Sequence, residues 1–147
     1  MECQLFHAEI AESIFRISDA LHGPNEDGFS DVPGQATQNS YLVIGEERAA
    51  LIDLAVDTPE LYSYACSIAG MPVQVLLTHG HPDHVYHLDT VSEAWLHPAD
   101  HSLVRYGIPG LSAPMDVCLH PLADGQRINL GGRELRVIAI PGHTLGS

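Results

Sequence analysis

The sequence is poor in basic residues and has no long apolar run. It contains 6 Lys and Arg residues against 19 Asp and Glu, which gives a formal net charge of −13. Because such a field repels phosphate groups, we expect neither nucleic acid nor a membrane surface as a partner. No apolar stretch approaches the roughly 20 residues that a membrane-spanning helix requires.

Cysteine is also scarce. Cys3, Cys66 and Cys118 are odd in number, widely spaced and form no CxxC pair. This pattern argues against a disulfide framework and favours reduced thiols. The first ten residues, MECQLFHAEI, lack the basic segment of a signal peptide. Together these features predict a cytoplasmic protein.

The 147 residues, 45% of them hydrophobic, are enough for one domain with its own core. Strand-like and helix-like segments alternate, which predicts a layered sheet domain of the α/β or α+β class. The expected strands lie within residues 4–19, 40–53 (a hairpin that turns at 45–48), 73–78, 94–97, 126–130 and 134–140. The expected helices are residues 58–69, begun by Thr58 and stopped by Gly70, then 83–95, and 98–106, stopped by Gly107.

Histidine, by contrast, is abundant: the chain has 10. The segment LLTHGHPDHVYHLD, residues 76–89, directly follows an apolar strand-like run. In an extended segment, residues two apart point the same way, so His79 and His81 can reach one point, with Gly80 between them allowing close approach. Open sheets tend to bind ligands at the carboxyl ends of their strands. Imidazoles followed by the carboxylate of Asp83 therefore favour a site for zinc, manganese or iron.

A third ligand must come from elsewhere in the chain. His143, in IPGHTLGS, again follows an apolar strand-like run, LRVIAI. Two separate strands thus deliver histidines at equivalent positions, as expected for a site built at a sheet edge.

These segments resemble a known family. THGHPDH is similar to the HxHxDH signature of the metallo-β-lactamase superfamily, and PGHTLGS to its PGHTxGS motif. NSYLVIGEERAALIDLAVD resembles the family's first hairpin. The resemblance implies that His79, His81 and His143 hold one metal ion, and that Asp83 and His84 serve a second. It places Asp53 nearby as a supporting residue, although Asp53 could equally be a simple turn former.

The resemblance also implies a reaction. A metal-dependent hydrolase of this family attacks an ester, thioester, lactone or amide carbonyl of a small-molecule substrate with metal-bound hydroxide. Asp83 would be the catalytic residue that orients this nucleophile and takes its proton. Zn²⁺ is the expected cofactor, with iron or manganese as alternatives.

The same resemblance predicts an α+β fold that forms the N-terminal half of an αβ/βα sandwich, a mainly antiparallel or mixed sheet with helices on one face. Family members continue into a second half that supplies a bridging aspartate and a final histidine. Residues 1–147 would then be a single domain truncated after PGHTLGS, with an incomplete second metal site. A bare sheet face would result, so we expect the chain either to be a fragment of a longer protein or to self-associate over that face.

Two other classes of function stay open. One is a mononuclear iron oxidoreductase similar to persulfide dioxygenases. The other is a half-domain that binds metal without turnover. After His84 the sequence has VYH where thioester-hydrolysing relatives often carry two glycines, so it departs from the glyoxalase II pattern. We expect structural roles for the remaining histidines of this region, with His87 on a helix face bonded to Asp83, solvent or the neighbouring turn; they are His87, His97, His101 and His120.

Overall fold

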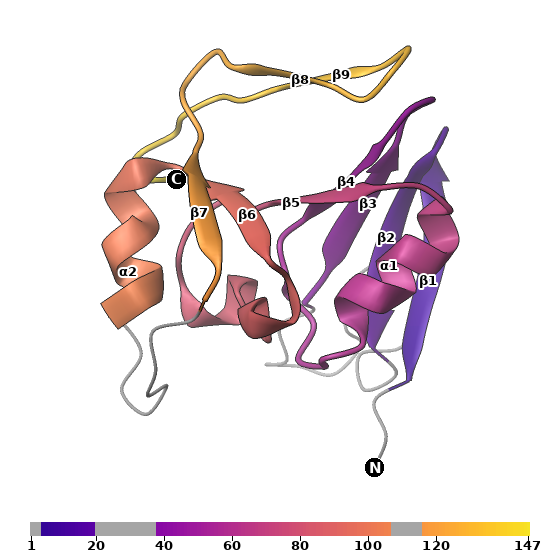
Figure 1. Ribbon diagram of the computed structural model, residues 1–147, viewed down its shortest axis with the longest axis horizontal. Coiled ribbons are helices and arrows are strands. Elements are labelled where there is room, and N and C mark those ends of the chain that lie inside the picture. Colours follow the sequence, from indigo (N-terminus) through magenta and orange to yellow (C-terminus); the bar gives the residue numbers. More distant parts are fainter. Residues whose placement is uncertain (1–3, 20–37, 107–115) are drawn as a thin grey trace.

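The computed structural model describes residues 4–19, 38–106 and 116–147. Within these residues seven strands form one sheet in chain order, and two more form a separate hairpin (Figure 1). The sheet strands are β1 (Leu5–Ala11), β2 (Ile14–Asp19), β3 (Ser40–Ile44), β4 (Ala49–Ile52), β5 (Val73–Leu76), β6 (Glu93–Leu96) and β7 (Cys118–Pro121). The hairpin is β8 (Arg127–Asn129) with β9 (Glu134–Arg136), and the helices are α1 (Leu61–Ala69) and α2 (His101–Tyr106).

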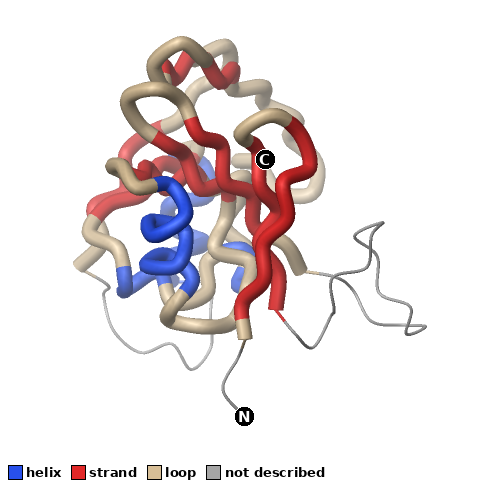
Figure 2. The backbone as a smooth tube through the Cα atoms, turned by 90° about the vertical axis from the view of Figure 1, so that its right-hand side faces the viewer, coloured by secondary structure: helices blue, strands red, loops and turns tan. Residues whose placement is uncertain are grey.

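The sheet is mixed. Strands β1 to β4 pair antiparallel, whereas β4, β5, β6 and β7 pair parallel. Seen from the β1 edge, β1 and β2 form a long strand pair beside the N-terminal end (Figure 2). A mixed sheet with few helices confirms the predicted α+β class. The parallel half matters for the site, because it brings the carboxyl ends of β4 and β5 to the same edge.

The β3–β4 hairpin agrees with its prediction. Its turn closes with a hydrogen bond of 3.0 Å from the Gly45 N–H to the Arg48 carbonyl. Gly45 is required for packing, because a Cβ there would lie 2.1 Å from the carbonyl oxygen of Leu130. Residues of β4 are buried on both faces, which explains the uninterrupted apolar run AALI.

Helix α1 ends where the sequence predicts but begins later. Gly70 adopts φ +63° and its N–H binds the Cys66 carbonyl at 2.9 Å, a left-handed helix end. Thr58 was expected to cap the helix but lies outside it, and its hydroxyl donates to the Glu60 carboxylate instead. The expected start at Thr58 was wrong, since the helix begins at Leu61; the Thr58 hydroxyl also accepts the Glu60 N–H at 3.5 Å, and the Thr58 carbonyl accepts the Leu61 N–H at 3.3 Å.

The predicted helix over 83–95 is also wrong. Two short 3₁₀ turns, Pro82–His84 and Leu88–Thr90, lead directly into β6. Between them the chain pairs with the segment after β4: the Leu54 N–H binds the His84 carbonyl at 2.9 Å, and the Tyr86 N–H binds the Leu54 carbonyl at 3.0 Å. These tertiary hydrogen bonds replace the ones that a helix would have made.

The sheet separates two apolar cores. On one face, Leu42, Leu51 and Val75 pack with Leu61 of α1 and Val104 of α2. The predicted placement of helices on one face is thus confirmed. On the other face, a smaller core lies beneath the β8–β9 hairpin, which Figure 1 shows above the sheet. Its buried residues are Val43, Ala50, Leu76, Leu122, Ile128 and Leu130.

The last segment is more exposed than its apolar sequence suggests. The expected strand 134–140 stops at Arg136, since Ala139 donates to Asp124 and Ile140 to the Ser147 carbonyl rather than to β8. Ile138 and Ile140 are consequently 66% and 71% exposed. The expected self-association of the chain stays a prediction. Among the described helices none is long and apolar enough to cross a membrane.

Candidate metal centre

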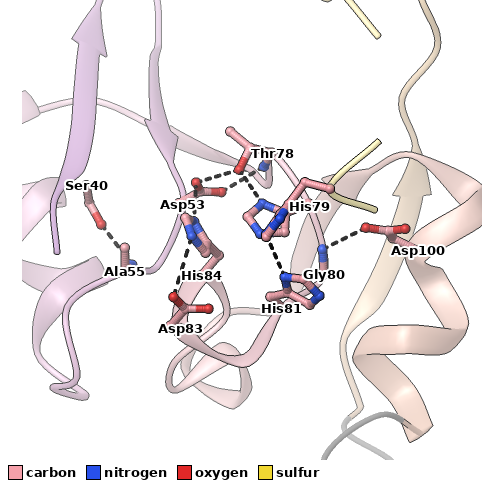
Figure 3. A network of polar contacts seen from close by, with 11 residues as sticks. Ser40, Asp53, Ala55, Thr78, His79, Gly80, His81, Asp83, His84 and Asp100 are labelled. Atoms are coloured by element: carbon pink, nitrogen blue, oxygen red, sulfur yellow. Dashed lines mark hydrogen bonds and ion pairs between the residues drawn. The ribbon is translucent and has the colours of Figure 1, made fainter. Parts of the chain in front are cut away.

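The histidine cluster lies where β4 and β5 end. Asp53 follows β4 directly, and the loop that begins with Thr78 follows β5 (Figure 3). The backbone joins the two ends, because the Asp53 N–H binds the Leu76 carbonyl at 2.9 Å. The predicted location at a carboxyl edge of the sheet is therefore the observed one.

His79, His81 and His143 come together at this edge. One ring nitrogen from each lies within 4.8 Å of the other two. The ring centroids are 4.9 Å apart for His79 and His81, 4.8 Å for His79 and His143, and 4.5 Å for His81 and His143. Three imidazole nitrogens at such spacing can surround one ion, so the structure produces the convergence that the sequence predicts.

His79 is the buried member, and its hydrogen bonds fix its tautomer. The Thr78 hydroxyl donates its only proton to Asp53 Oδ2 at 2.7 Å. It must therefore accept from Nδ1–H of His79, 3.0 Å away. Nε2 is then left with a lone pair, and this atom is buried without a hydrogen-bond partner among the described residues. A buried unpaired acceptor is costly unless something binds it, and a cation fits that role.

His81 and His143 are more exposed and contact each other. Nδ1 of His81 lies 2.9 Å from Nε2 of His143, a hydrogen-bond distance. Burial and the neighbouring His84, His81 and His143 lower the pKa of His79, only partly opposed by Asp53. Neutral imidazole is the form that binds a metal ion, so the electrostatics also suit a metal centre.

Asp53 organises the site without joining the triad. Its Oδ1 accepts the Thr78 N–H at 2.7 Å, and its Oδ2 accepts from Nδ1 of His84 at 2.8 Å (Figure 3). The residue is buried and adopts φ +62°, a left-handed conformation that aspartate tolerates better than most residues. Of the two interpretations left open by the sequence, the hydrogen bonds favour the supporting role.

His84 and Asp83 lie beside the triad. The His84 ring is 4.1 Å from that of His79, and its Nε2 is 3.8 Å from Asp83 Oδ2. The hydrogen bond to Asp53, opposed by burial but aided by the charges of Asp53 and Asp83, raises the pKa of His84. The Asp83 side chain is 52% exposed. Neither residue belongs to the group of three whose ligand atoms converge, and their service to a second ion stays a prediction.

Sequence reasoning missed Asp100. This buried residue, in the turn Pro98–Asp100 before α2, binds the backbone of both histidine-bearing loops. Burial would raise its pKa, but hydrogen bonds from Thr144, Gly80 and Gly146 outweigh that effect and lower it. Its partners are 20 to 46 residues distant, and no spacing in the sequence signals them.

The four histidines for which the sequence predicts structural roles have hydrogen-bond partners of that kind. His87 binds Asp57 at 2.9 Å rather than Asp83. His120 binds Glu93 at 2.8 Å and stacks on Trp95. The remaining two bind backbone atoms: Nδ1 of His97 accepts the Ala99 N–H, and Nε2 of His101 lies 2.8 Å from the Leu96 carbonyl.

A cavity of about 460 Å³ adjoins the triad. His79 and His143 form part of its wall, and most of the rest is apolar. It lies between the sheet and the chain from β8 to the last residue, with Ile52, Leu76 and Ile140 among its lining residues. A molecule or segment within it would therefore have direct access to two of the three histidines.

Comparison with known proteins agrees with these features. Residues 33–147 match the family described as the Metallo-beta-lactamase superfamily. The chain is 29% identical to a probable metallo-hydrolase, YqgX, of Bacillus subtilis over 126 residues, covering 78% of this chain and 60% of that protein. It is 34% identical to a hydroxyacylglutathione hydrolase of Acidiphilium cryptum over 116 residues, covering 78% of this chain and 44% of the relative.

Solved structures show the same fold. A metallo-beta-lactamase from Cronobacter sakazakii superposes with a TM-score of 0.69 at 19% identity, covering 98% of this chain and 57% of that one. A class B3 di-zinc metallo-beta-lactamase from an Alaskan soil metagenome gives a TM-score of 0.66 at 17% identity, covering 96% and 54%. The chain thus spans about half the length of the proteins that it matches.

Proposed function

Because this chain belongs to the metallo-beta-lactamase superfamily, we propose that it carries the primary metal centre of a metal-dependent hydrolase. The observation that supports this most directly is the convergence of three histidines at the carboxyl edge of the sheet. The unpartnered Nε2 of His79 supports it further, since a ligand nitrogen needs a free lone pair.

In the proposal, His79, His81 and His143 hold one ion, with zinc the preferred metal for a three-histidine site that keeps one open position. A bound divalent ion lowers the pKa of water toward about 7 and polarises a carbonyl oxygen, so it supplies a nucleophile near neutral pH. The residues of the chain would accept the proton and hold the ligands in place.

Asp83 is the proposed proton acceptor. Its side chain is half exposed beside His84, so a carboxylate oxygen can receive a proton and pass it to solvent. Asp53 has a different role, because both its oxygens are engaged by Thr78 and His84. It holds the start of the His79 loop and the His84 ring in place.

The proposed substrate is a small molecule with an ester, thioester, lactone or amide carbonyl. Hydroxyacylglutathione, named by one relative, is the first compound to test. The bulky residues Tyr86 and His87 stand close after His84, where thioester-hydrolysing relatives often carry two glycines. The panel of test substrates therefore includes a lactone and a β-lactam as well.

The test is hydrolysis of that panel by the zinc-loaded chain and by His143→Ala, with bound metal measured in both. Turnover by the parent chain that disappears in the variant supports the proposal. Stoichiometric zinc without turnover of any compound would leave a metal-binding half-domain in its place. If iron dominates in protein purified without added metal, and a persulfide is oxidised, the hydrolase proposal is replaced by an iron oxidoreductase.

A further inference from the structure

Asp100 connects two loops that are far apart in the sequence. It is 2% exposed and lies between the loop that carries His79 and His81 and the loop that carries His143. Figure 3 shows its carboxylate directed at the backbone of Gly80, between the two histidines of the first loop.

The carboxylate accepts hydrogen bonds from both loops. Asp100 Oδ2 accepts the Gly80 N–H at 2.9 Å and the Thr144 hydroxyl at 2.7 Å. Oδ1 accepts the Gly146 N–H at 2.9 Å. These donors lie next to His79 and His81 on one side and next to His143 on the other. A single buried group therefore fixes the position of one loop relative to the other.

Close packing supports the same conclusion independently. A Cβ at Gly146 would lie 2.6 Å from both Cγ and Oδ1 of Asp100. A Cβ at Gly80 would lie 3.0 Å from Val104 Cγ2 and 3.1 Å from the Asp100 carbonyl oxygen. Both loops approach Asp100 so closely that only glycine fits at the two contact points without displacement.

We propose that Asp100 is a positioning residue that sets the spacing of His79, His81 and His143 for metal binding. Among the described hydrogen bonds of its carboxylate none goes to the three rings, and it acts through the backbone on either side of them. The inference rests on the proposed metal centre. We call the hydrogen bonds from the two loops to Asp100 the Asp100 clamp. Partners that orient metal ligands typically contribute 10–100-fold to affinity, so loss of this clamp should weaken metal binding by about that factor.

Asp100→Asn is the sharpest variant, because it keeps the size of the side chain while replacing one acceptor oxygen by a donor. Its matched control is Ser40→Ala. Ser40 is completely buried and its hydroxyl accepts the Ala55 N–H at 3.0 Å, so the control also removes a buried acceptor of a backbone N–H. No described hydrogen bond links Ser40 to either histidine loop.

The measurement is the dissociation constant of the full chain for Zn²⁺ and for Co²⁺, by competition with a chromophoric chelator, together with the visible spectrum of bound Co²⁺. We expect Asp100→Asn to raise both constants by roughly 10-fold or more and to alter the Co²⁺ spectrum. Ser40→Ala should lower the melting temperature while leaving the constants and the spectrum unchanged. Equal constants in Asp100→Asn and the parent chain would overturn the proposal.

A second pair of variants covers the case in which Asp100→Asn does not fold. Thr144→Val removes the hydroxyl that binds Asp100, and Thr144→Ser retains it. We expect weakened metal binding in Thr144→Val and recovery in Thr144→Ser. Equal weakening in both would contradict the clamp.

Amide hydrogen exchange in the metal-free chain tests the clamp without any metal. The Gly80 and Gly146 N–H groups should be protected in the parent chain and should exchange faster in Asp100→Asn. If the parent chain binds neither metal, the proposed function fails, while this exchange pattern still decides whether Asp100 holds the two loops. Unchanged exchange at both glycines would show that it does not.

Discussion

His81 and His143 are 62 residues apart in the sequence, yet Nδ1 of one ring lies 2.9 Å from Nε2 of the other. The contact is made by loops that follow different segments of the fold, and Asp100 binds the backbone of both loops. The triad is therefore assembled by the protein itself. A site prepared in this way loses less freedom when an ion binds than three independent side chains would.

Loss of one histidine should remove high-affinity metal binding. His143→Ala takes away the one ligand that the second loop supplies in the proposed site, so we expect affinity for Zn²⁺ to fall by more than the roughly 10–100-fold typical of an outer-sphere partner. Competition with a chelator measures this. His120→Ala is the matched control, because His120 binds Glu93 and stacks on Trp95 away from the triad. Equal losses in the two variants would contradict the assignment.

Substitution by alanine should affect Zn²⁺ binding differently at two glycines of the last loop. Gly146→Ala forces a Cβ against the Asp100 carboxylate, whereas a Cβ at Gly142 meets no atom of the described residues within 4 Å. We expect Gly146→Ala to weaken Zn²⁺ binding by about 10-fold, as for other supports of metal ligands, and Gly142→Ala to leave it unchanged. The same chelator competition checks both. A Gly142→Ala variant as impaired as Gly146→Ala would count against the clamp.

His84 and His79 should titrate on opposite sides of the ordinary histidine pKa of about 6.5. In the metal-free chain the hydrogen bond to Asp53 raises the pKa of His84, and burial lowers that of His79. NMR titration of the ring protons measures both values. In Asp53→Asn the pKa of His84 should fall, and an unchanged value would refute the pairing.

The sign of the stability effect follows from the raised pKa. Protonated His84 is favoured in the folded state, so its ion pair with Asp53 stabilises the metal-free fold fully below the unfolded pKa of about 6.5. That contribution disappears as the pH rises through the folded pKa. The difference in melting temperature between the parent chain and Asp53→Asn should therefore decrease with rising pH. A difference that grows with pH would contradict this interpretation.

The smaller core, on the sheet face that the β8–β9 hairpin covers, should contribute to the free energy of unfolding although no described helix packs on it. Leu130 is completely buried beneath the turn of the β3–β4 hairpin, and its carbonyl accepts the Glu47 and Arg48 N–H groups. Leu130→Ala should lower the free energy of unfolding by about 2–5 kcal/mol. Leu145→Ala, at a residue that is 80% exposed, should change it by less than about 0.5 kcal/mol. Urea denaturation followed by circular dichroism compares them, and equal effects would refute the packing argument.

What the sequence could predict depends on how local the determining interactions are. The β3–β4 hairpin and the end of α1 at Gly70 follow from turn residues and apolar patterns within a few positions. The segment 83–95 could not be predicted that way, because pairing of Leu54 with the chain around Val85 decides its conformation. Local sequence patterns cannot distinguish a polar segment that forms a helix after a strand from one that pairs with another loop.

The same distinction applies to the site. The convergence of His79 and His81 could be predicted from their spacing at the end of a strand, and that of His143 from its matching position after a second apolar run. Asp100 was not found, since a single aspartate in a turn before a helix usually serves only as a cap. Only the folded chain shows that both of its oxygens are directed at the two histidine-bearing loops.

The most direct test of the central claim is a crystal of the zinc-loaded chain with diffraction data collected on both sides of the zinc absorption edge. We predict one strong anomalous peak with nitrogens of His79, His81 and His143 all about 2.0–2.1 Å away. A fully occupied peak elsewhere, with these three rings apart and unbound, would contradict the account.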